Sequence, residues 1–168
     1  MAETLDDVDS DKVMLSPQAV GQIPFNITKE KLQTLDGVTP ISASTDEPSA
    51  CEYVGINEWP GIYLMIYEGR VVRADVSTDM AEKVSLYAAD SLLPSIHYLR
   101  TLKPSINQLR ERFPELTIQP HAYFGLGVYL IYSDPESEFA LVIEYAEGKV
   151  LGLRAGMLPN VLWVEGCS

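Results

Sequence analysis

Histidine and cysteine are scarce in this chain, and they are the residues that most often carry metal and redox chemistry. The 168 residues include two cysteines and two histidines. His97 and His121 do not form H-E-x-x-H or another ligand spacing, and Cys51 and Cys167 form no C-x-x-C pair. Motifs for acyl transfer, dinucleotide binding and phosphate loops are missing too. The sequence therefore predicts no metal, no cofactor, no catalytic residue and no enzymatic activity.

Basic residues and long apolar runs are also in short supply. Twelve Lys and Arg face 24 Asp and Glu, which gives a formal net charge of -12. Such a charge repels phosphate backbones and anionic headgroups, so we expect no nucleic acid and no membrane surface as partner. A membrane-spanning helix needs about 20 apolar residues, whereas the longest runs, near Gly127–Tyr132 and Ile62–Tyr67, are strand-sized. No integral membrane span is expected.

The beginning of the chain is too polar to join a core. Residues 1–12 carry five acids and one base, which is typical of a solvated tail. We predict a disordered acidic tail over residues 1–14. The rest is globular in composition, with 46% hydrophobic and 21% charged residues, and we expect one cooperative domain.

Patterns in the first half predict a short helix and then a meander of strands. Thr28 is placed to cap a helix that runs to Leu35, before Gly37. Strands are predicted at Cys51–Val54, Ile62–Tyr67 and Val71–Val76, with a turn at Glu68-Gly69 between the last two.

The second half repeats this order. Leu102, Ile106, Leu109 and Phe113 recur at helical spacing, and that helix should be entered near Pro104 and stopped by Pro114. Turns are predicted at Asp134-Pro135 and Glu147-Gly148. Five strands follow in the prediction: His121–Phe124, Val128–Tyr132, Glu138–Tyr145, Val150–Arg154 and Val161–Val164.

The two halves align with a shift of 79 residues, which places Gly69 on Gly148. Met80–Tyr98 matches nothing and is interpreted as an insertion of loop and helix. The predicted fold class is α+β: two tandem helix-then-antiparallel-sheet units forming one continuous or paired sheet, with helices packed on one face. The first unit covers residues 15–78 and the second residues 79–168.

Three segments carry a resemblance: GIYLMIYEGRVVRADV, EYAEGKVLGLRAG and the ending VEGCS. From Leu15 to its end, the chain resembles tandem beta-lactamase-inhibitor-protein-like domains and small outer-membrane assembly lipoproteins of bacteria. The spacing of Cys51 and Cys167 allows a disulfide or two inert thiols; the resemblance favours the disulfide. It also implies a periplasmic or secreted location, with the signal sequence absent from this chain. A cytoplasmic location is the alternative.

A binding face is predicted from strand alternation. Ile62, Leu64 and Ile66 should face the core, together with Val72, Ala74 and Val76. The opposite face then presents residues of the types favoured at protein interfaces. The candidate partner-binding residues are Trp59, Tyr63, Met65, Tyr67 and Arg73. Burial of these side chains under helices or the insertion is the alternative interpretation.

Three functions follow as hypotheses. The first is a non-enzymatic binding protein of the bacterial envelope, an inhibitor or assembly partner that uses a sheet face. The second is a small-ligand or carbohydrate-binding module with a pocket between the halves, lined by tyrosines and Trp59. The third, a hydrolase, requires two carboxyl groups facing each other across a groove, from among Glu52, Glu58, Glu138 and Glu144. The sequence identifies neither the partner nor the oligomeric state.

Overall fold

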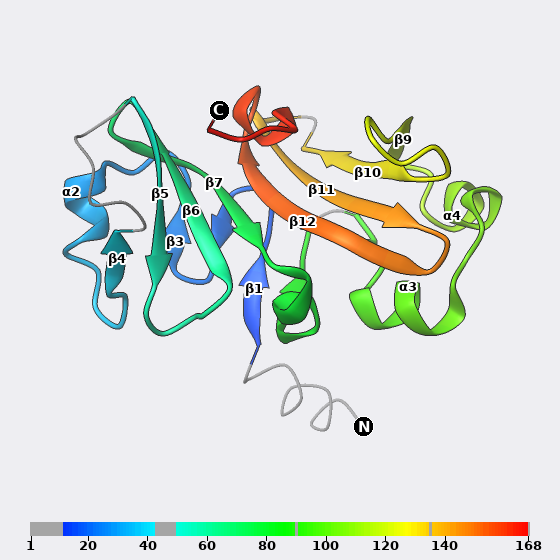
Figure 1. The fold of residues 1–168 in the computed structure, drawn as a ribbon, viewed down its shortest axis with the longest axis horizontal. Helices are drawn as coiled ribbons and strands as arrows, with labels where there is room; N and C mark the ends of the chain where they lie inside the picture. Colours follow the sequence, from blue (N-terminus) through cyan, green and yellow to red (C-terminus); the bar gives the residue numbers. More distant parts are fainter. Residues whose placement is uncertain (1–11, 43–49, 90, 135, 168) are drawn as a thin grey trace.

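The computed structural model describes residues 12–42, 50–89, 91–134 and 136–167, and consists mainly of β-strands (Figure 1). Strands make up 41% and helices 18%, in one four-stranded and one eight-stranded sheet. The predicted α+β fold of two helix-then-sheet units is therefore wrong. Of the predicted acidic tail, residues 1–11 lie outside the described residues, while Val13 and Met14 belong to a strand.

The eight-stranded sheet forms the frame of the molecule, and all of its neighbouring strands are antiparallel. Its order is β4-β5-β6-β7-β12-β11-β10-β9. The strands are β4 (Pro40–Ser42), β5 (Cys51–Ile56), β6 (Ile62–Tyr67), β7 (Arg70–Val76), β9 (Thr117–Pro120), β10 (Val128–Ser133), β11 (Phe139–Ala146) and β12 (Lys149–Met157).

Two tight hairpins form where the sequence predicts them. Glu68 and Gly69 have φ angles of 50° and 81°, and Glu147 and Gly148 have 47° and 84°. Positive φ at both central residues is the signature of a type I′ turn, whose twist matches that of the flanking strands. The hairpins β6–β7 and β11–β12 are thus fixed by local sequence.

The two hairpins join along β7 and β12, in the centre of the sheet. Ala74 is opposite Ala155, and Asp75 is opposite Arg154. Asp75 and Arg154 are 79 residues apart, the same shift that relates Gly69 to Gly148. The central contact of the sheet is therefore made by two positions that align with each other in the sequence.

The smaller sheet has the order β3-β2-β1-β8. Its strands are β1 (Val13–Leu15), β2 (Ala19–Val20), β3 (Ile23–Pro24) and β8 (Val84–Leu86). β1 and β8 run parallel although they are far apart in the chain. Strands of two or three residues are too short to show alternation, so sequence patterns could not reveal this sheet.

The helices are short: α2 (Lys29–Leu32), α3 (Ile96–Leu102), α4 (Ile106–Arg112) and two 3-10 turns, η1 (Thr78–Lys83) and η2 (Asn160–Leu162). The Thr28 hydroxyl accepts from the Lys31 N–H, which confirms the predicted cap. The helix predicted between Pro104 and Pro114 is α4, whereas Leu102, the first residue of the predicted apolar spacing, belongs to α3, which ends at Lys103 with φ 46°. Ser105 and Gln108 then start α4 with a capping box.

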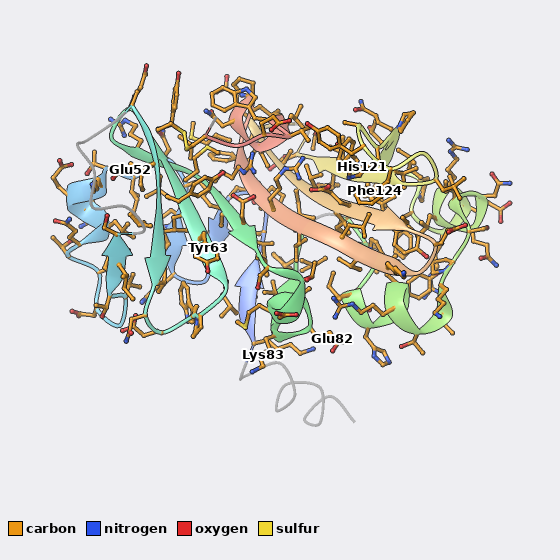
Figure 2. The ribbon with its side chains drawn as sticks, in the orientation of Figure 1. Glu52, Tyr63, Glu82, Lys83, His121 and Phe124 are labelled. Atoms are coloured by element: carbon orange, nitrogen blue, oxygen red, sulfur yellow. A yellow bond between two sulfur atoms is a disulfide. The ribbon has the colours of Figure 1, made fainter. Side chains whose placement is uncertain are left out.

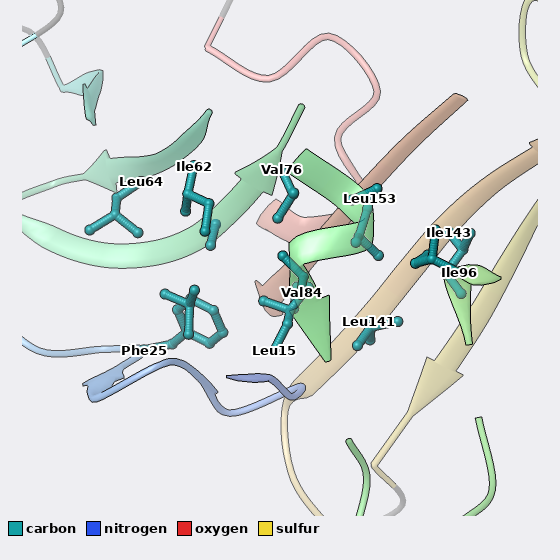
Figure 3. Packing of buried hydrophobic residues seen from close by; sticks show 14 of the residues in the cluster. Leu15, Phe25, Ile62, Leu64, Val76, Val84, Ile96, Leu141, Ile143 and Leu153 are labelled. Atoms are coloured by element: carbon teal, nitrogen blue, oxygen red, sulfur yellow. The ribbon is translucent and has the colours of Figure 1, made fainter. Parts of the chain in front are cut away.

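The hydrophobic core lies between the large sheet, the small sheet and buried side chains of the helices, among them Ile96 of α3 (Figure 3). Ile62, Leu64 and Ile66 are buried in it, as predicted. On β7 a bulge opposite Met65 and Ile66 shifts the alternation, so that Val71 joins the core in place of Val72. Among the described residues, none of the helices has the length and apolar character that a membrane crossing requires.

Candidate functional site

The face of the eight-stranded sheet that points away from the core, called the outer face below, is partly covered by residues 159–167, called the C-terminal segment. A disulfide joins Cys51 on β5 to Cys167, with Cα atoms 5.5 Å apart and a sequence separation of 116. The predicted pairing is confirmed. It fixes the end of the chain against the sheet, and Trp163 lies edge-on to Tyr67 with ring centroids 5.3 Å apart.

Arg73 binds the C-terminal segment from below. It lies on β7 with 4% of its surface exposed. Its Nε and Nη2 atoms donate to the carboxylate of Asp75 at 2.7–3.1 Å. Its Nη1 donates to the carbonyl oxygens of Asn160 at 3.0 Å and Trp163 at 2.7 Å. A buried guanidinium needs such partners to offset its lost hydration.

Tyr53 is packed into the same region. A Cβ atom placed on Gly166 would stand 2.1 Å from its hydroxyl oxygen, so the C-terminal segment lies directly on the ring. Burial raises the pKa of Tyr53, and the nearby Asp75 carboxylate raises it further. The phenol is therefore kept neutral under the segment.

A second buried arginine links the C-terminal segment to the other half of the sheet. Arg154 on β12 donates from Nε to the Val161 carbonyl at 2.6 Å and from Nη1 to Glu144 Oε2 at 2.6 Å. The other Glu144 oxygen, Oε1, lies 2.5 Å from His121 Nε2. His121, Glu144 and Arg154 thus form a continuous polar network under the outer surface.

His121 organises the loop between β9 and β10, residues 121–127. The N–H groups of Tyr123 and Phe124 point to its Nδ1 at 3.0 and 3.3 Å. Nδ1 is therefore the acceptor, and Nε2 carries the proton that is donated to Glu144. The ring stacks on Tyr129 with centroids 4.5 Å apart, and the Tyr129 hydroxyl accepts from the Ala122 N–H.

Large apolar side chains project into solvent from this ordered loop and from the C-terminal segment. The two segments meet where the Tyr123 hydroxyl donates to Glu165. We call their exposed apolar residues the apolar patch: Tyr123 (65% exposed), Phe124 (52%), Leu126 (71%), Leu162 (42%) and Val164 (38%). Exposed anchors on an ordered frame are typical of a protein-binding surface.

The residues predicted for binding are only partly available on the surface. Met65 is fully buried, and Arg73 is buried under the C-terminal segment. Tyr67 is half-buried beside Trp163. Trp59 packs against the core, and the edge of its indole lies against Gly21, where a Cβ atom would stand 2.5 Å from the ring. Tyr63 remains 44% exposed (Figure 2).

Tyr63 borders a shallow groove on the outer face, away from the apolar patch. Ile41, Gly55 and Tyr63 stand side by side on β4, β5 and β6. Gly55 has no side chain to fill the space between the other two, which leaves a hollow of about 330 Å³. Figure 2 shows Tyr63 on one half of the sheet and His121 with Phe124 on the other.

The apolar patch escaped sequence analysis because its loop was interpreted as structure. His121–Phe124 was predicted as a strand, but the strand there is β9, which ends at Pro120. Val161–Val164 was also predicted as a strand and lies in η2 and the coil after it. One signal was present: four large side chains in the run HAYFGLG sit beside two glycines, outside any alternating pattern.

The polar groups of the buried network are engaged with one another and with the backbone. Both ring nitrogens of His121 are engaged, as described above, and so are both oxygens of Glu144. Glu52 pairs with Lys29. Glu58 accepts from the backbone and the hydroxyl of Thr39, which lowers the pKa of Glu58. Within the described residues, no three His, Cys, Asp or Glu side chains are placed to hold a metal ion.

No protein-family model, curated protein or solved structure matches this chain. The function of the chain is therefore inferred from the geometry of the outer face.

Proposed function

We propose that this protein is a non-enzymatic binding protein of the bacterial envelope, which docks a protein partner on the apolar patch as an inhibitor or assembly partner. The observation that carries the proposal is the exposure of five large apolar side chains on two segments that a buried hydrogen-bond network holds in place. Exposing apolar surface of this kind to water is unfavourable in free energy. Covering it with a partner removes that cost and so favours binding.

The loop of residues 121–127 is well ordered. This order favours a binding role for its exposed apolar residues rather than exposure without a function. Three successive N–H groups, those of Ala122, Tyr123 and Phe124, are satisfied by the side chains of Tyr129 and His121. A Cβ atom at Gly127 would be 3.1 Å from both His121 and Phe124, so the loop is closely folded. Anchors held in one conformation lose little entropy on binding, which improves affinity.

The envelope location rests on the Cys51–Cys167 disulfide and on the resemblance described above. Disulfides form and persist in oxidising compartments such as the periplasm, and they are rare in the cytosol. The absence of a spare catalytic group around His121 supports a role without chemistry of its own.

The test is affinity capture with the purified protein as bait, run on envelope and cytosolic extracts under non-reducing conditions. The double variant Phe124→Ser/Leu126→Ser removes two exposed anchors and keeps every hydrogen bond of the buried network. Because the Phe124 ring lies edge-on to His121 with centroids 5.1 Å apart, circular dichroism and thermal unfolding of the variant accompany the capture. Tyr63→Ser is the matched control, because it removes an exposed aromatic side chain from the other half of the outer face.

We expect one stoichiometric envelope partner that Tyr63→Ser retains and the double variant loses. Loss of each interface anchor typically costs about 2 kcal/mol or more, so the double variant should weaken binding at least about a thousandfold. A partner lost only on Tyr63→Ser would contradict the patch and move the site to the Ile41–Gly55–Tyr63 groove. Absence of any partner would contradict the protein-binding role.

A second candidate function rests on a pocket of about 420 Å³ between the N-terminal segment and the second half of the chain. Pro17 and Gln18 form one side, and Tyr132, Ser133 and Asp134 form another. A small ligand or carbohydrate would fit this volume. Trp59 lies elsewhere, packed on Gly21. Thermal-shift screening with sugars should then show stabilisation that Ala89→Trp, which fills the pocket, abolishes.

A further inference from the structure

The two stretches of sequence that contain the apolar patch carry negative charge and no Lys or Arg. From Phe113 to Gly148 the chain has six acids and no Lys or Arg, and from Ala155 onward its one ionisable side chain other than cysteine is Glu165. The loop of the patch and the C-terminal segment both fall within these two stretches. A partner that covers the patch therefore meets no Lys or Arg from the two segments that form it.

One of these carboxylates contacts the patch directly, because Glu165 accepts from the Tyr123 hydroxyl. Glu147, in the turn after β11, has bases beside it: Lys149 is exposed, and the Lys103 side chain packs against Gly148. Arg154 on β12 is buried and bound to Glu144. The two segments that form the patch therefore present a negative charge of their own, at Glu165.

A second copy of this chain is a poor occupant for the same reason. A symmetric dimer through the patch would place Glu165 of each copy near the patch of the other, with each chain at a net charge of -12. Like charges brought together at an interface destabilise it, and no Lys or Arg in the loop or the C-terminal segment could compensate.

Accordingly, we infer that the partner is a protein that presents a cationic apolar segment, with aromatic or aliphatic side chains that cover the patch and Lys or Arg around them. This inference rests on the proposed function and specifies the chemistry of the partner. Opposite charge attracts the partner at a distance and raises its association rate, while the apolar contacts hold it once docked.

A random dodecapeptide library displayed on phage tests the inference with a defined probe. The library is selected on the oxidised wild-type protein and, in parallel, on Phe124→Ser/Leu126→Ser. A second variant, Val164→Ser, alters the patch from the C-terminal segment and guards against a folding defect confined to the loop. Circular dichroism and thermal unfolding establish that each variant keeps the wild-type fold.

Peptides that depend on the patch should be enriched in Lys and Arg next to aromatic or aliphatic residues. Their synthetic forms should bind at least about tenfold more weakly when their basic residues are replaced by Glu, and more weakly at high salt.

Patch-dependent peptides that are neutral or acidic would overturn this inference and leave the proposed function standing. If no peptide depends on the patch, both fail. A concentration-dependent dimer that the double variant abolishes would identify a second copy as the occupant and would overturn the cationic partner.

Discussion

Arg73 and Arg154, on the two central strands of the large sheet, both donate to carbonyl oxygens of the C-terminal segment. Arg73 reaches Asn160 and Trp163, and Arg154 reaches Val161. Each guanidinium also has a carboxylate partner, Asp75 for one and Glu144 for the other. The segment is therefore held by buried charge as well as by its disulfide.

Replacement of Arg154 by leucine should destabilise the fold strongly. Arg154→Leu leaves the Glu144 carboxylate without its cation and the Val161 carbonyl without its donor. Breaking a buried ion pair from one side costs about 3 to 5 kcal/mol, and solvent access to Glu144 places the expected loss near 3 kcal/mol. Denaturant unfolding followed by tryptophan fluorescence measures it.

Arg110→Leu is the matched control, because Arg110 is exposed on α4. A surface substitution of this kind should change the free energy of unfolding by less than about 0.5 kcal/mol. If both variants unfold at the same denaturant concentration, the buried network contributes no more than a surface charge and the interpretation is wrong.

Removal of the disulfide should weaken the fold while leaving the C-terminal segment on the sheet. The bridge closes a loop of 116 residues, and a loop of about this length is worth about 4 to 5 kcal/mol in the chain-entropy model. Cys51→Ala/Cys167→Ala should lose roughly that amount in denaturant unfolding. Trp163 emission under native conditions, measured in a Trp59→Phe background so that Trp163 is the one tryptophan, should stay unchanged because the arginines still hold the segment. An immediate red shift would show that the disulfide alone holds it.

Two glycines should respond differently to the same substitution. A Cβ atom at Gly156 would stand 2.2 Å from the Val72 carbonyl oxygen and 2.6 Å from the Arg73 Cα. Gly156→Ala forces β7 and β12 apart and should cost about 3 kcal/mol or more. At Gly125 a Cβ atom would meet no described atom within 4 Å, so Gly125→Ala should be nearly neutral. Equal melting temperatures for the two variants would refute the close approach.

Sequence patterns found the elements that are defined by neighbours along the chain. The apolar run Ile62–Tyr67 was predicted as a strand and matches β6, and the Glu68-Gly69 turn is where a type I′ hairpin needs it. The predicted fold class was wrong because it missed the small sheet. That sheet consists of the very short strands β1, β2, β3 and β8, and its β1–β8 pair joins segments about 70 residues apart. A local pattern of apolar and polar residues cannot predict contacts between segments that are so far apart in the chain.

The binding face was misjudged for a related reason. Alternation correctly places Met65 and Arg73 on the side away from the core. It cannot tell that a patternless segment near the end of the chain returns to cover that side. Two acidic side chains hold the guanidinium groups there, one of them, Asp75, two residues from its arginine and the other, Glu144, ten residues away.

Stability should fall at alkaline pH, partly through Tyr145. Its hydroxyl donates to the Pro104 carbonyl at 2.8 Å, and burial raises the pKa of Tyr145. The folded state then holds this proton more tightly than the unfolded state does. Its contribution is present below the ordinary tyrosine pKa of about 10 and is lost as the pH rises through the higher folded value.

Tyr145→Phe separates this effect from others. It should lose about 1 kcal/mol at neutral pH, where the hydrogen bond is made, and its free energy of unfolding should fall less steeply above about pH 10 than that of the wild type. Parallel curves for the two proteins would show that Tyr145 does not contribute to the alkaline transition. Urea unfolding at a series of pH values gives both quantities.

The bridge from Cys51 to Cys167 also determines how the molecule carries mechanical load. When the two ends of the oxidised chain are pulled apart, tension passes from Cys167 straight to β5 and bypasses every residue between the two cysteines. Only the chain before Cys51 can lengthen, so the β7–β12 contact and the apolar patch lie outside the force path. Pulled from its two ends, the oxidised protein would keep the apolar patch intact while its N-terminal strands give way.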